Sequence, residues 1–191
     1  MSAVAEGLPR EDADERHLRL FDWLERGQAD AVEATVAALK ANLASPALQE
    51  RGARALATLT LTETNCEKAG RAGAVEAIVA TMQRHMSIVS MMEACCQALC
   101  NMTFNSDNKI KAGNAGAIEC VVAAMRALGG NAGVQQQGCR ALRNITVNNA
   151  DIAIKAGITG AVECVVAAMR VHANNADMQK HEQVFLDRMG H

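Results

Sequence analysis

Near-identical phrases recur along this chain at a fixed interval. GAIECVVAAMR occupies residues 116–126 and GAVECVVAAMR occupies residues 160–170, while related phrases begin at Gly73 (GAVEAIVATM) and Asp30 (DAVEATVAAL). The copies therefore start at 30, 73, 116 and 160. A catalytic motif is rarely duplicated in so short a chain, whereas a packing surface is copied whenever a structural unit is repeated. We therefore predict four successive units, the last of them incomplete.

The copied phrase has the spacing of an amphipathic helix, with apolar residues at i, i+3, i+4 and i+7. In the third copy these are Ile118, Val121, Val122 and Met125. A longer helix with one apolar side follows in each unit, and a short run ending in KAG precedes the next copy. We predict three helices per unit, the short one ended by a glycine in the left-handed conformation. These glycines are Gly70, Gly113 and Gly157.

Composition agrees with an all-α fold. Half of the 191 residues are apolar, two are proline, and no alternating β-branched run is present. Good helix formers such as Ala, Leu, Met, Gln and Arg are abundant. Residues 10–26 (REDADERHLRLFDWLER) predict a helix that caps the first unit, with partner docking as its alternative role. We thus divide the chain into an acidic N-terminal segment with its capping helix (1–27) and a repeat domain (28–191).

Two phrases in the predicted long helices resemble the third helix of the armadillo repeat. They are ACCQALCNMT (residues 94–103) and QGCRALRNIT (residues 137–146). KAGNAGAIECVV and KAGITGAVECVV are similar to the turn between that family's first two helices, and the resemblance covers about residues 28–190. HEAT repeats, with two helices, are the nearest alternative. The resemblance implies a right-handed α-solenoid whose third helices line a concave groove that binds extended peptides.

The resemblance also implies binding residues. The family's Asn in the phrase AL-x-N, which holds the ligand backbone, corresponds to Asn101 and Asn144. Nuclear-signal receptors of the family carry a Trp four residues earlier, and the absence of a Trp there argues against nuclear-signal binding. The predicted groove residues are Arg51, Arg54, Thr58, Gln97, Asn101, Gln137, Arg140, Arg143, Asn144 and Arg188.

The arginines make the predicted groove mildly basic, although Glu93 and Asp187 dilute the charge. Arginine binds carboxylates in a bidentate manner, so the groove is suited to an extended acidic segment. The alternative is that these arginines are simply solvated on an exposed helix face and bind no ligand. We predict a non-catalytic scaffold or adaptor that binds a partner protein. The alternative is a structural subunit of a larger assembly.

Other function classes have little support in the sequence. A net charge of −2 and four aromatic residues do not favour nucleic-acid binding, and no apolar run approaches the roughly 18 residues of a membrane span. No cofactor, metal site or catalytic pair is expected. Seven cysteines without a Cys-x-x-Cys pair predict reduced thiols, with Cys66 exposed, in a cytoplasmic protein, although an organelle remains open.

The end of the array shows one sharp substitution. Glu182 stands where the other copies have Gly52, Cys95 and Gly138. A terminal repeat needs a polar outer face, so Glu182 predicts that the array ends here with a solvent-facing surface. Docking of this surface onto another chain is the alternative.

Overall fold

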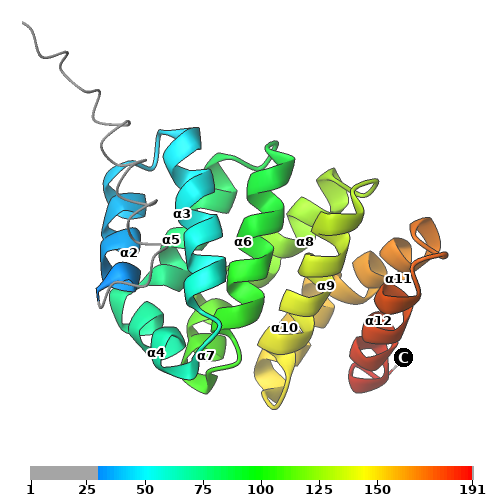
Figure 1. The fold of residues 1–191 in the computed structure, drawn as a ribbon. Helices are drawn as coiled ribbons and strands as arrows, with labels where there is room; N and C mark the ends of the chain where they lie inside the picture. Colours follow the sequence, from blue (N-terminus) through cyan, green and yellow to red (C-terminus); the bar gives the residue numbers. More distant parts are fainter. Residues whose placement is uncertain (1–29, 191) are drawn as a thin grey trace, which may run out of the picture.

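The computed structural model describes residues 30–190, apart from the side chains of Asp177 and His181. The predicted capping helix at residues 10–26 lies outside this range. The described residues form eleven α-helices and no strand (Figure 1). The helices are α2 (Ala31–Ala41), α3 (Pro46–Leu59), α4 (Glu63–Ala72), α5 (Ala74–Arg84), α6 (Val89–Met102), α7 (Ser106–Ala115), α8 (Ala117–Ala127), α9 (Ala132–Thr146), α10 (Ala150–Thr159), α11 (Ala161–Val171) and α12 (Ala176–Arg188).

Three kinds of helix alternate along the chain. The middle helices α2, α5, α8 and α11 contain the copied phrase, the long helices α3, α6, α9 and α12 follow them, and the short helices are α4, α7 and α10. Each kind packs against the next of its kind, so that the long helices form one layer with the middle helices behind it (Figure 1). We call this layer the long-helix layer. The short helices lie along one end of both.

The apolar stripe of the copied phrase forms the core. Its four positions are fully buried in the second and third units, as the helical spacing predicted. In the fourth unit, Val166 and Met169 at the same positions are only half-buried. Burying such a stripe is the main favourable term in folding, so each unit is stabilised largely by the unit packed against it.

Side-chain hydrogen bonds, which we call ties, connect each unit to the preceding one at matching positions. Each tie reaches a backbone carbonyl 41 to 44 residues earlier, which is one repeat length. Equivalent residues make equivalent bonds: Asn101 to Ala57 and Asn144 to Cys100, Lys111 to Gly70 and Lys155 to Gly113, and His85 to Leu43 and His172 to Gly129. The internal repetition of the sequence is therefore also a repetition of contacts.

The glycines predicted to end the short helices do not end them. Each short helix continues to the second glycine of its copy, at Gly73, Gly116 or Gly160, where φ is 80°, 84° and 84°. Only glycine adopts this left-handed conformation without steric cost. The prediction of Gly70, Gly113 and Gly157 as helix ends was therefore wrong by three residues.

Gly70 and Gly113 instead allow close helix approach. A Cβ atom at Gly70 would collide with the side chain of Asn108 on α7, and one at Gly113 would lie 2.9 Å from Ile152 Cδ1 on α10. Asn108 needs this space because its Nδ2 donates to the carbonyls of Cys66 (2.8 Å) and Met102 (3.0 Å). The small residue thus serves the stacking of successive short helices.

Candidate functional site

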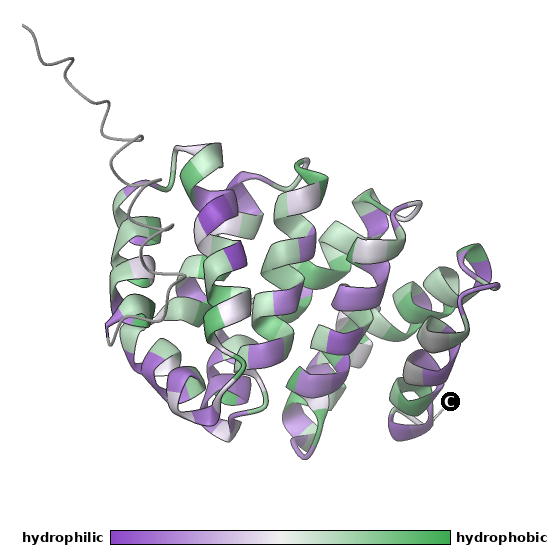
Figure 2. Ribbon diagram, viewed as in Figure 1, coloured by the Kyte–Doolittle hydropathy of each residue, from purple (hydrophilic) through white to green (hydrophobic). Residues whose placement is uncertain are grey.

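All ten predicted groove residues lie on the long helices, but their exposure differs. Arg54, Thr58, Gln97 and Arg188 are exposed; Arg51, Gln137, Arg140 and Arg143 are half-buried; Asn101 and Asn144 are buried. Figure 2 shows hydrophilic residues on the long helices, with many of them along α9. The structure thus brings the predicted residues into one layer, and four of these residues are exposed to solvent.

Local sequence signals place these helices. α9 begins after Asn131, whose Oδ1 accepts a hydrogen bond from the Val134 N–H at 2.8 Å, and α12 begins after Asn175, which caps Met178 at 3.0 Å. α3 begins at Pro46, a residue suited to the first helical position. These local signals set the residues at which α3, α9 and α12 begin.

The two asparagines of the AL-x-N phrase connect neighbouring long helices. Asn101 is 9% exposed and its Nδ2 donates to the Ala57 carbonyl at 2.8 Å, while Asn144 is 6% exposed and donates to the Cys100 carbonyl at 2.9 Å. An amide nitrogen has two hydrogens and the amide oxygen accepts as well. Asn144 makes two further bonds, since its Nδ2 also donates to Cys100 Sγ at 3.3 Å and its Oδ1 accepts from Arg143 Nη2 at 3.4 Å. Within the described residues, Asn101 uses only one amide hydrogen in this way.

Arg54 on α3 forms an ion pair with an acid of its own helix. Arg54 Nη2 donates to Glu50 Oε1 at 2.8 Å, one turn away. Burial acts to raise the pKa of Glu50, but hydrogen bonds from Ser90 and Arg54 outweigh it and hold that pKa below its ordinary value. Glu50 thus stays ionised and offsets the positive charge of Arg54.

One arginine on α9 and one on α12 lack such an ion pair with any described residue. Arg140 and Arg188 have no ion pair within the described residues, and the Nε of Arg140 is buried without a hydrogen-bond partner. The Oε1 of Gln137, one turn before Arg140, is also buried and unpartnered. Arg143 Nη2 donates to Asn144 Oδ1 at 3.4 Å. These buried, unpartnered atoms lie beneath the surface of the layer, and the Nε of Arg51 on α3 is buried in the same way.

Glu182 is buried, and the prediction of a solvent-facing position for it was wrong. It is 1% exposed, because it lies one helical turn from Met178 and from Phe185 and Leu186 on the buried stripe of α12. Neither carboxyl oxygen has a hydrogen-bond partner of good geometry, although the Cys139 thiol of α9 lies beside it. Burial raises the pKa of Glu182 to about 7, and the Cys139 thiol opposes this rise.

The cysteines are packing residues. All seven are buried and unpaired, which contradicts the predicted exposure of Cys66. Its Sγ donates to the carbonyls of Thr60 (3.2 Å) and Asn101 (3.4 Å). Burial raises the pKa of each thiol, and that of Cys96 to about 12. A thiol held protonated is a poor nucleophile and metal ligand.

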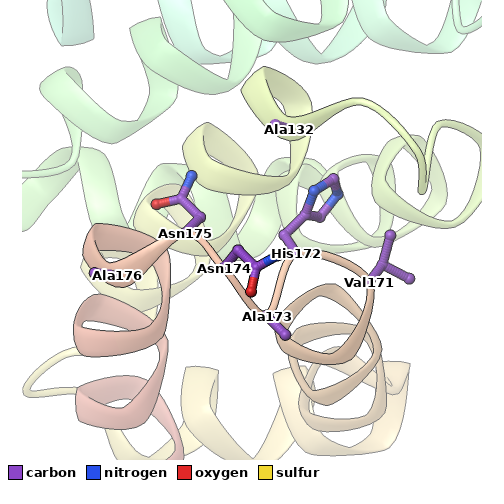
Figure 3. Close-up of a pocket in the computed structure, with 7 residues that line it drawn as sticks. All are labelled: Ala132, Val171, His172, Ala173, Asn174, Asn175 and Ala176. Atoms are coloured by element: carbon purple, nitrogen blue, oxygen red, sulfur yellow. The ribbon is translucent and has the colours of Figure 1, made fainter.

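A shallow hollow of 680 Å³ lies where the loop between α11 and α12 meets the start of α9 (Figure 3). Two of its polar side chains have structural partners. His172 Nε2 bonds the Gly129 carbonyl at 3.0 Å, and Asn175 caps α12. No acid, lysine or arginine lines this hollow. Its walls offer no charged group with which to recognise or transform a ligand.

Two further hollows occupy matching positions at the C-terminal ends of long helices. One of 220 Å³ is lined by Leu61 and Phe104, and one of 540 Å³ by Val147 and Arg188. Leu61, Phe104 and Val147 occupy the same position in successive units, and the first two are strongly exposed. Their common register was visible in the sequence, but their exposure was not. These three apolar side chains lie at the edge of the long-helix layer.

Residues 30–190 contain no group of three or more His, Cys, Asp or Glu side chains arranged to hold a metal ion. None of the described helices is by itself long and apolar enough to cross a membrane. The pair α10 and α11, which is bent by 64° at the break between the two helices, reaches the necessary length and apolar composition only when both helices are taken together.

Comparison with known proteins identifies a shared fold. Neither the protein-family models nor the curated proteins gave a match. One matching solved structure is the crystal structure of an engineered protein from the Northeast Structural Genomics Consortium. It is 23% identical, with a TM-score of 0.66, and the match covers 93% of this chain and 83% of that one. The chain is thus an all-helical, repeat-like protein that resembles an engineered protein.

Proposed function

We propose that this chain is a right-handed, armadillo-like α-solenoid that acts as a non-catalytic interaction scaffold. In this proposal the long-helix layer forms a groove that binds an extended, acidic segment of a partner protein. Equivalent asparagine, lysine and histidine ties that recur after one repeat length support the solenoid. The alternation of middle, long and short helices supports its likeness to the three-helix armadillo unit.

The observation that carries the binding proposal is the outward face of the long-helix layer. It leaves Arg54, Thr58, Gln97 and Arg188 exposed. Long polar side chains at helical spacing can bond an extended backbone and its carboxylates at several points. The amide groups that Asn101 leaves unused would add to these contacts.

A peptide array tests this proposal. The array would carry short extended peptides of varied sequence, and the wild-type protein would be compared with two double variants. Arg54→Ala/Gln97→Ala changes exposed residues of the long-helix layer, whereas Arg84→Ala/Arg170→Ala changes exposed residues of the middle helices. We expect the first variant to lose peptides that the second retains. The proposal is refuted if both variants keep the wild-type set or if the wild-type protein binds no peptide.

The second candidate function, a structural subunit, is favoured by apolar exposure on the last unit. Ile154 and Ile158 on α10 are 63% and 83% exposed, and Val171 at the end of α11 is also exposed. Ile154 and Ile158 lie one turn apart on α10, and exposed apolar side chains that adjoin in this way are typical of contacts with another chain. Light scattering after size-exclusion chromatography separates the two functions. Association that Ile154→Ser/Ile158→Ser abolishes would favour the subunit, and a monodisperse monomer would favour the free scaffold.

A further inference from the structure

Successive short helices pack on each other through one buried glycine. On α4 this is Gly70, which lies under Asn108 of α7, and an added Cβ there would collide with that side chain. On α7 it is Gly113, where an added Cβ would lie 2.9 Å from Ile152 Cδ1 of α10. The absence of a Cβ lets the two helices approach closely. The same contact therefore recurs after one repeat length along the short helices.

A lysine completes each of these contacts. Lys111 Nζ of α7 donates to the Gly70 carbonyl at 2.5 Å. Lys155 Nζ of α10 donates in the same way to the Gly113 carbonyl at 2.6 Å. On both helices the lysine comes three residues after the side chain that covers the glycine. A short helix that joins the stack thus supplies two side chains, one that packs on the glycine and a lysine that bonds its carbonyl.

Among the described residues, no helix covers the equivalent glycine of α10, Gly157. It is exposed, and an added Cβ would lie 3.8 Å from Met189 Cε, at an ordinary van der Waals distance. Its carbonyl accepts the Gly160 N–H at 3.0 Å and has a second lone pair for another donor. Ala153, one turn before Gly157, borders the 540 Å³ hollow together with Met189 at the end of α12. A further short helix therefore has space, a glycine and an acceptor here.

Two isoleucines make the surface beside this glycine apolar. Ile154 is 63% exposed and lies three residues before Gly157, hence on the same side of α10, and Ile158 is 83% exposed. At the equivalent positions of α4, Glu67 and Arg71 form an ion pair at 3.7 Å on an exposed face. Apolar residues thus replace charged ones on the short helix that has no successor among the described residues. We call the open seat the surface made by Ala153, Ile154, Gly157, Ile158 and Met189.

We propose that the open seat binds a short, lysine-bearing helix of another protein chain. The bound helix repeats the contact that α10 makes with α7. It places an apolar side chain over Gly157 and, three residues later, a lysine that donates to the Gly157 carbonyl. The proposal continues an interface that the structure already contains twice. It rests on the second candidate function, that of a structural subunit, for which it names the contact and the kind of partner, and it does not depend on peptide binding by the long-helix layer.

A helix of a different protein fits the open seat better than a second copy or a lipid surface does. The described short helices of a second copy already use their lysines, because Lys111 and Lys155 bond carbonyls of their own chain and Lys68 also has a partner. Helices that lie on lipid carry several Lys or Arg residues on their polar face. α10 has one lysine, Lys155, and it also pairs with Glu119 at 3.0 Å.

A labelled helical peptide that copies α10 tests the open seat by fluorescence anisotropy. The probe has the sequence of residues 149–159 (NADIAIKAGIT), with a hydrocarbon staple joining the positions of Ala153 and Gly157, because so short a helix is unstable alone. We expect saturable binding to the wild-type protein. A probe with glutamine in place of its lysine should bind about threefold more weakly.

Two variants of the protein locate the bound probe. Gly157→Leu places a side chain in the open seat and should weaken binding about tenfold. The matched control Asn114→Leu adds the same side chain to the exposed face of α7 and should leave binding nearly unchanged. Ile154→Ser removes apolar surface from the seat and should also weaken binding. Thermal unfolding of the three variants verifies that they are folded.

The outcomes separate this inference from the proposed functions. Equal affinity of Gly157→Leu and Asn114→Leu for the probe, or no binding of the probe at all, would overturn the open seat. Without probe binding, self-association that Ile154→Ser/Ile158→Ser abolishes would keep the structural subunit and make a second copy the occupant. Binding to mixed phosphatidylcholine–phosphatidylserine vesicles that the same variant abolishes would instead identify a lipid surface. If array peptides bind through the long-helix layer while the probe does not bind, the open seat fails and the scaffold function stands.

Discussion

The buried carboxyl of Glu182 makes the stability of this protein depend on pH. In the native state its pKa is about 7, against an ordinary value of 4.5. Because the native state holds the proton more tightly, stability is complete below about pH 4.5 and is lost as the pH rises through about 7. One pKa unit corresponds to about 1.4 kcal/mol, so the total loss is about 3 kcal/mol.

The substitution Glu182→Gln tests this reasoning because it keeps the size of the side chain and removes its titration. We expect the free energy of unfolding of the wild-type protein to fall, relative to that of the variant, by about 3 kcal/mol from pH 4.5 to pH 8. Urea denaturation followed by circular dichroism at several pH values measures this difference. Hydrogen exchange of the α12 amides shows whether the loss is local to that helix.

The control is Glu163→Gln, which removes an exposed carboxylate from α11 in the same unit. Its stability should follow the wild-type curve across the pH range. If the Glu182→Gln and wild-type curves run parallel, the carboxyl does not titrate in the native state and the argument from burial is wrong. The same conclusion follows if the wild-type protein gains stability, relative to the variant, as the pH rises.

Three further perturbations probe the packing. Gly70→Ala should lower the free energy of unfolding by about 1–3 kcal/mol, because its Cβ collides with a side chain of α7. Gly130→Ala, which has open space around it, should lower it by less than about 1 kcal/mol. Urea denaturation of the two variants measures the difference. Asn144→Ala should cost about 1–3 kcal/mol by leaving a buried carbonyl without its donor, while the exposed Asn114→Ala should be nearly neutral, and equal thermal shifts would contradict this. The seven thiols should resist a thiol-specific reagent in the native protein and react after denaturation, so prompt labelling of the native chain would contradict their burial.

The repeated pattern made the helices predictable from the sequence. The stripe of the copied phrase is set by helical spacing alone, which is why its buried positions in the second and third units could be named in advance. The roles of the two glycines in each turn could not. Gly70 and Gly73 both suit a helix end, and the choice between them depends on Asn108, which lies 38 residues further along the chain.

The candidate site was predictable in position but not in detail. Repeat alignment places Arg54, Arg140 and Arg188 on the long helices, yet which arginine is paired depends on individual neighbours such as Glu50. Glu182 was misread because a carboxylate in a repeat usually marks a surface, whereas this one lies on the buried stripe.

The ties that span one repeat length have a consequence for how such a chain can grow. Lys155, for example, reaches the Gly113 carbonyl of the preceding unit, just as Lys111 reaches that of Gly70. Each lysine donates to a carbonyl of the preceding unit. An in-frame duplication of a whole unit within the gene would therefore place an acceptor carbonyl before the new copy and a donor lysine after it. Lengthening by such duplication would leave the older modules undisturbed, whereas a deletion of half a module would break every tie across the junction at once.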